Sequence, residues 1–157
     1  MGTNFLGWLL PAILALLLLS AGIEDARTRE IANWKNAAIA LIAPLWWLAS
    51  GLSPWPEMAL QLGVAIGVFA LFCVAFQFGW MGGGDVKLIG AVALWLAPSP
   101  LLRMLLVMSI AGGALTLLIM LDHFIRKNRD APEIPYGVAI ALAGLLALHE
   151  QVLNQVA

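Results

Sequence analysis

Two aspartates are the candidates for chemistry in a chain that is 62% hydrophobic and 11% charged. Asp25 follows the first apolar run, and Asp85 follows three consecutive glycines in the stretch "MGGGDVKLIG". An ionisable residue at membrane depth is costly and points to function. Two neighbouring carboxylates share a proton, because both cannot ionise easily. Such a pair can activate water against a peptide carbonyl, as aspartic proteases do.

Other interpretations of these aspartates stay open on the residues alone. Asp85 could be a helix N-cap, which would be worth about 1 kcal/mol. Capping explains neither a second aspartate nor the glycines Gly82, Gly83 and Gly84, which permit a positive φ and close backbone approach. The acids could also relay protons in a small transporter, or serve only structure in an assembly protein. Against a relay, both acids are expected at one membrane face.

The composition predicts an all-α polytopic membrane protein with one domain, residues 1–157. A soluble domain carries roughly 25% charged residues. With only 11%, this chain could not cover a globular surface with polar groups. Six apolar runs predict about six transmembrane helices; the fourth run is short for a membrane core of about 30 Å. The expected ranges are Phe5–Ile23, Asn36–Ser50, Met58–Phe78, Val86–Ala97, Leu101–Leu121 and Tyr136–Leu153.

The basic residues predict how these helices are oriented, because positive charge collects on the cytoplasmic side. They follow the first, third and fifth runs, with Arg103 as the exception: Arg27, Arg29, Lys35, Lys87, Arg126, Lys127 and Arg129. Both termini are then on the outer, periplasmic side. Two crossings separate Asp25 from Asp85, so both aspartates return to the cytoplasmic boundary. The tryptophans expected in the outer aromatic belt are Trp8, Trp46, Trp47, Trp55 and Trp95.

Several kinds of site are not expected. The single cysteine, Cys73, excludes a disulfide framework and a cysteine-rich zinc module. His123 and His149 are far apart, so no metal site and no cofactor are predicted. The scattered basic residues do not indicate nucleic acid as a partner. The first apolar run lacks a basic leading region, which favours a retained span over a cleaved signal.

Three segments, in order along the chain, resemble the type IV prepilin peptidases, which are GxGD intramembrane aspartic proteases. "GGGDVKL" (Gly82–Leu88) is similar to the GxGD signature. "EDARTREIANW" (Glu24–Trp34) looks like the first catalytic segment of that family. "IPYGVAIA" (Ile134–Ala141) resembles the Pro-aromatic-Gly element that opens its last helix.

The resemblance implies a six-helix peptidase with Asp25 and Asp85 as the catalytic pair. Its substrates would be prepilins or pseudopilins, cut after a glycine at the cytoplasmic face of the bacterial inner membrane. The resemblance also gives roles to other positions, although positive-inside topology explains the basic ones equally well. These positions are Gly82, Gly83 and Gly84 in the motif backbone; Arg27, Arg29 and Lys87 as possible substrate contacts; and Asn33, Pro135 and Gly137 as structural motif residues.

The sequence departs from the family pattern in two respects. Ala32 stands where the family usually has proline, so a looser turn is expected before Asn33. The N-terminal domain with paired CxxC motifs is not seen, which makes the chain look like the small peptidases of Tad/Flp pili and puts N-methyl transfer in doubt. Glu24 is expected to point about 100° around the helix from Asp25, and Asp122 is expected to be a solvated helix end. The oligomeric state is not indicated.

Overall fold

The computed structural model describes residues 5–126 and 134–156, and this part of the chain is helical throughout, with no strand. The expectation of an all-α fold is confirmed. Lys127 and Arg129, two of the basic residues that predict the orientation, lie outside the described residues. The elements are α1 (Phe5–Thr28), α2 (Asn33–Ala49), a π-helical turn η1 (Pro54–Met58), α3 (Ala59–Gln77), α4 (Gly83–Ala93), α5 (Pro98–Arg126) and α6 (Tyr136–Val156).

Four segments of the described chain are long and apolar enough to cross a membrane: Phe5–Thr28, Pro54–Gln77, Pro98–Ile125 and Tyr136–Asn154. The other two α-helices are shorter. α2 has 17 residues, at the lower limit for a span. α4 has 11 residues, which at 1.5 Å per residue reach only about 16 Å. Four of the about six expected spans are therefore supported by length and composition. The full number of spans and the positions of the termini relative to the membrane remain predictions.

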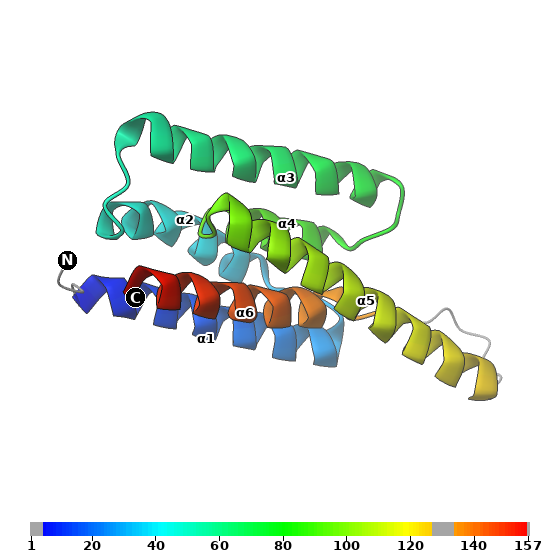
Figure 1. Cartoon of the computed structure of the whole chain (residues 1–157). Coiled ribbons are helices and arrows are strands. Elements are labelled where there is room, and N and C mark those ends of the chain that lie inside the picture. The colour runs from blue at the N-terminus through cyan, green and yellow to red at the C-terminus, as the bar shows by residue number, and fades with distance from the viewer. Residues whose placement is uncertain (1–4, 127–133, 157) are drawn as a thin grey trace.

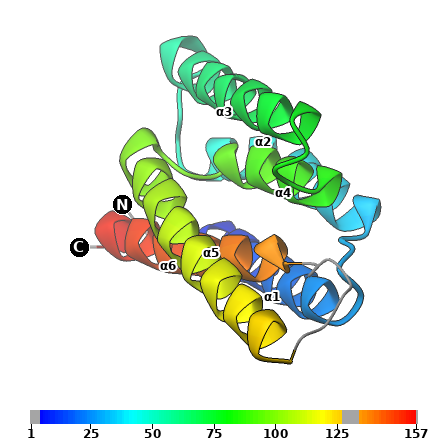
Figure 2. The ribbon, with the colours of Figure 1, turned by 90° about the vertical axis from the view of Figure 1, so that its right-hand side faces the viewer.

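The helices form a layered bundle with α4 at its centre (Figure 1). α3 forms one outer layer, α2 and α4 lie beneath it, and α1 and α6 pack together on the far side; the view in Figure 2 shows the same order. α5 packs along α6. α4 contacts α2, α3 and α6, and all of its residues from Val86 to Ala93 except Lys87 are buried. A helix this short is tolerated because protein, rather than lipid, surrounds it.

The C-terminal end of α4 is held by buried polar side chains from three other helices. Backbone carbonyls at a helix end lack helical partners and must be satisfied in some other way. Here Trp46 and Trp47 of α2, Gln61 of α3 and Gln151 of α6 donate to the carbonyls of residues 93–96, over 2.6–3.2 Å. Trp95 itself donates to the Ile39 carbonyl.

The prediction of an outer aromatic belt is therefore wrong for these three tryptophans. Trp46, Trp47 and Trp95 are buried, and the rings of Trp46 and Trp95 stack. An indole offers one N–H donor on a large apolar ring, which suits a buried helix end as well as it suits a membrane interface.

Replacing Gln61 with Met is expected to lower the thermal unfolding temperature. Gln61 Nε2 donates to the Ala93 and Leu96 carbonyls, and methionine has similar bulk but no donor. Leaving a buried carbonyl without a partner costs about 1–3 kcal/mol. Thermal unfolding in detergent measures the change, with Gln77→Met at the exposed end of α3 as the matched control. Equal melting of the two variants would contradict this account of the α4 end.

Candidate active site

Asp25 lies in the last turn of α1, with only 4% of its surface exposed, and its carboxylate faces the start of α6. Its Oδ2 accepts a hydrogen bond from the Val138 backbone N–H at 3.2 Å, and the Gly137 backbone also donates to this carboxylate. The first N–H groups of a helix have no helical acceptor and carry partial positive charge. The amino end of α6 therefore supplies hydrogen-bond donors to the Asp25 carboxylate.

Asp85 is the third residue of α4 and is 8% exposed. The residue before the helix is Gly82, which has no side chain to cap it. The Asp85 carboxylate reaches back and accepts a hydrogen bond from the Gly82 backbone. Asp85 thus lies inside the first helical turn and is not the N-cap residue of α4.

The glycines before Asp85 serve close packing and do not supply a positive φ. Gly82 has φ −71°, and the described glycines with positive φ are Gly51 and Gly79. The glycines of this motif therefore do not use the positive φ that glycine permits. A Cβ added at Gly82 would lie 3.1 Å from Asp85 Oδ2, and one at Gly84 would lie 3.4 Å from the Ile31 Cβ. The expected close approach is confirmed.

Ile31 connects the surroundings of the two aspartates. This buried side chain belongs to the segment between α1 and α2, and it packs on Gly84, next to Asp85. It also packs on Gly137: a Cβ there would lie 2.8 Å from both the Ile31 Cδ1 and the Asp25 Oδ2. Segments far apart in the sequence therefore meet at one end of the bundle, with the two aspartates among them.

The electrostatics of Asp85 reflect this arrangement. α4 is not one of the four segments that can span a membrane. Burial, together with the nearby Asp25 carboxylate, raises the pKa of Asp85 to about 7, although the Gly82 hydrogen bond opposes the rise. Burial disfavours the charged form of a carboxyl group, and a like charge adds to that cost. At neutral pH Asp85 can therefore hold a proton beside Asp25.

Asp85→Asn is expected to raise thermal stability at alkaline pH. Between 3.8, the ordinary pKa of Asp85, and about 7, the folded state binds the proton more tightly than the unfolded state. Ionisation of Asp85 therefore lowers stability as pH rises through this window. A cost of about 1–2 kcal/mol corresponds to about 3–6 °C. Unfolding temperatures at pH 4 and pH 8 test this: the variant should gain only at pH 8, and an equal gain at both would contradict the assignment.

The other predicted site residues occupy different surroundings. Asn33 and Lys87 are exposed and hydrogen-bonded to each other, at 2.8 Å between Asn33 Oδ1 and Lys87 Nζ. Arg27 and Arg29 are exposed at the end of α1. Pro135 is buried immediately before α6, two residues from Gly137.

A groove of about 520 Å³ lies between α2, α3 and α4. Its wall is apolar along α3, from Leu62 to Phe69, and Asn33 and Lys87 lie at its polar part. Asn36, which also lines it, donates to the Gly84 carbonyl at 3.3 Å. The groove therefore adjoins the segment that carries Asp85.

Sequence reasoning missed the roles of Glu24, Ile31 and Lys35. Lys35 was expected only as a cytoplasmic anchor, but it is buried and forms an ion pair with Glu24, at 2.9 Å between Nζ and Oε2. One available signal was the presence of opposite charges on either side of a short interhelical segment. The packing of Ile31 on two distant glycines left no such signal in the sequence.

The sequence profile described as the Type IV leader peptidase family matches residues 12–117. Relatives from Xanthomonas campestris pv. campestris and Stutzerimonas stutzeri are each named prepilin leader peptidase/N-methyltransferase. The first is 32% identical, over 66% of this chain and 39% of its own length. The second is 31% identical, over 85% of this chain and 48% of its own length.

A Burkholderia pseudomallei relative of the same name is 27% identical, over 69% of this chain and 38% of its own length. The chain thus spans less than half the length of these relatives. No solved structure matches it. The family profile covers about two thirds of the chain, including both Asp25 and Asp85. On this match, the chain belongs to the type IV leader peptidase family.

Proposed function

We propose that this protein is a prepilin leader peptidase that hydrolyses one peptide bond with Asp25 and Asp85. The observation that carries the proposal is the placement of these two buried carboxyl groups at one end of the bundle, where the Asp25 charge acts on Asp85. The names of the relatives add independent support for a prepilin leader peptidase.

The raised pKa of Asp85, about 7, supports a division of roles between the two carboxyl groups. Asp25, ionised at the amino end of α6, takes a proton from water as the water oxygen attacks the scissile carbonyl carbon. Asp85, protonated, donates to the carbonyl oxygen and stabilises the tetrahedral intermediate. Asp25 then passes its proton to the leaving nitrogen as the C–N bond breaks, and Asp85 recovers a proton from the hydroxyl group as the new carboxyl forms.

The substrate we propose is a prepilin or pseudopilin with a short basic leader, cut after a glycine at the cytoplasmic boundary of the bacterial inner membrane. The apolar groove beside α4 suits the apolar helix of such a substrate. Arg27 and Arg29, exposed beside Asp25, remain candidates for substrate contact. The activity we propose is peptide cleavage, and prepilins of the Tad/Flp type are the first substrates to test.

Cleavage of a defined substrate tests this function. The detergent-solubilised protein is incubated with a Flp-type prepilin, and mass spectrometry locates the cut. The expected product is a single released leader ending in glycine, formed equally well in the presence of a metal chelator. A folded protein that releases no leader from cognate prepilins would overturn the proposal.

A further inference from the structure

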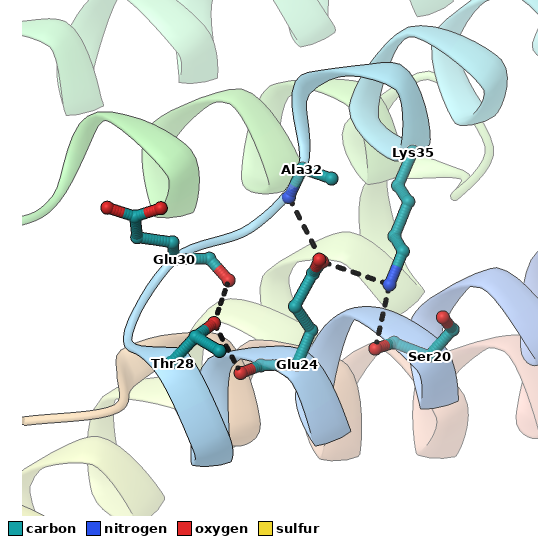
Figure 3. Close-up of polar contacts among 6 residues, drawn as sticks. All are labelled: Ser20, Glu24, Thr28, Glu30, Ala32 and Lys35. Carbon is teal, nitrogen blue, oxygen red and sulfur yellow. Dashed lines mark hydrogen bonds and ion pairs between the residues drawn. The ribbon is translucent and has the colours of Figure 1, made fainter.

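We propose that Glu24 and Lys35 (Figure 3) form a positioning pair that holds the segment between α1 and α2. Through Ile31, this pair sets how Asp25 and Asp85 lie relative to each other. This inference rests on the proposed catalytic role of the two aspartates. Neither Glu24 nor Lys35 is assigned to the chemical step.

One oxygen of Glu24 joins three parts of the chain. Glu24 Oε2 accepts from the Ala32 backbone N–H at 3.0 Å and pairs with Lys35 Nζ at 2.9 Å. Lys35 Nζ also donates to the Ser20 carbonyl, one turn earlier in α1, at 3.1 Å. Figure 3 shows Lys35 extending from the start of α2 down to α1, with the Glu24 carboxylate between them. The last turns of α1 are thereby tied to the beginning of α2.

The burial of Lys35 makes this connection specific. Its residue surface is only 7% exposed, and a buried ammonium group needs acceptors to replace water. The carboxylate and the Ser20 carbonyl supply them. Removing one partner of such a pair leaves the other charge uncompensated, so the two side chains depend on each other.

The segment that this pair holds does not adopt its path by intrinsic preference. Arg29 has φ 58°, in the left-handed region, which is unfavourable for a residue other than glycine. Its N–H donates to the Asp25 carbonyl at 2.9 Å, so the turn begins on the catalytic candidate itself. Thr28 Oγ1 adds bonds to the Glu24 and Glu30 carbonyls (Figure 3). A disfavoured turn of this kind persists when the surrounding contacts determine it.

The held segment contacts the surroundings of both aspartates. Ile31 precedes Ala32, the residue tied to Glu24, and it packs on Gly84 and on Gly137. Gly84 precedes Asp85, and Gly137 lies against the Asp25 carboxylate. Releasing Ala32 would therefore let Ile31 shift and change the spacing of the two carboxyl groups. A displacement of about 1 Å can cost an enzyme about 100-fold in rate.

Three variants test this pair. Glu24→Ala removes both the ion pair and the acceptor for Ala32, whereas Glu24→Gln keeps an acceptor oxygen without the charge. The matched control is Glu150→Ala, which breaks the Arg103–Glu150 ion pair near the other end of α6. Two readouts are measured: amide hydrogen exchange over residues 29–32, and kcat and KM for prepilin cleavage, with Asp25→Asn and Asp85→Asn in the same assay.

The expected result is faster exchange at Ile31 and Ala32 in Glu24→Ala, with kcat about tenfold or more below wild type and KM within about twofold. Glu24→Gln should recover part of kcat, and Glu150→Ala should match wild type in both readouts. Unchanged exchange would overturn the proposal, as would faster exchange with an unchanged kcat, or a rise in KM alone. Activity that survives the two aspartate substitutions would overturn the proposed function instead, whatever the exchange data show.

Discussion

Asp25→Asn and Asp85→Asn are each expected to reduce the rate of prepilin cleavage by about 10²–10⁴-fold without unfolding the protein. An asparagine at position 25 cannot take a proton from water, and one at position 85 cannot exchange a proton with the carbonyl oxygen. Both substitutions preserve the size of the side chain, so the packing of Ile31 on Gly84 and Gly137 is retained. Single-turnover cleavage rates in detergent, with thermal unfolding measured in parallel, give the result.

The matched control for this prediction is Asp122→Asn, which makes the same chemical change at an exposed position in α5. It should leave the cleavage rate within about twofold of wild type. Asp85→Asn should combine lost activity with higher stability at pH 8, because the substitution removes a buried charge. Cleavage that survives either Asp25→Asn or Asp85→Asn would mean that the carboxylate concerned has only a structural role. Loss of cleavage in Asp122→Asn would move the search for chemistry to that residue.

Gly137→Ala is expected to lower kcat by about 10–100-fold, through displacement of Asp25. The added Cβ would lie 2.8 Å from both Cγ and Oδ2 of Asp25 and equally close to Ile31 Cδ1. Atoms at that distance must move apart, and both neighbours belong to the proposed site. The effect should appear in kcat, since the groove between α2, α3 and α4 is lined by other residues.

Gly113→Ala in α5 provides the comparison, because a Cβ there meets nothing within 4 Å. Alanine is favoured over glycine inside a helix by about 0.5–1 kcal/mol, so this control should keep full activity and unfold no earlier than wild type. Gly137→Ala with wild-type kcat would contradict the view that the α6 start determines the position of Asp25.

The sequence alone was enough to indicate the class of protein, the helical fold and the two aspartates of interest. Composition indicates a membrane environment, since a chain with so few charged residues cannot cover a water-exposed surface with polar groups. The aspartates could be found because an acid in an apolar chain is conspicuous on its own. The family match needed only local segments, with Asp25 and Asp85 both inside the matched range.

Only the tertiary structure decided how those segments are used. Gly82 and Gly84 could have served a turn, but in the structure they let the Asp85 carboxylate and Ile31 approach the backbone closely. The packing of neighbouring elements determines which property of glycine is used. Trp46 and Trp95 were equally suited to a membrane interface and to a buried helix end. α4 is too short to cross a membrane, and the carbonyls at its buried end required N–H donors. Lys35 has the same charge whether it serves as a cytoplasmic anchor or as the ion-pair partner of Glu24. Its burial against Glu24 depends on how α2 docks on α1. These outcomes arise from contacts between distant segments, which neither composition nor periodicity encodes.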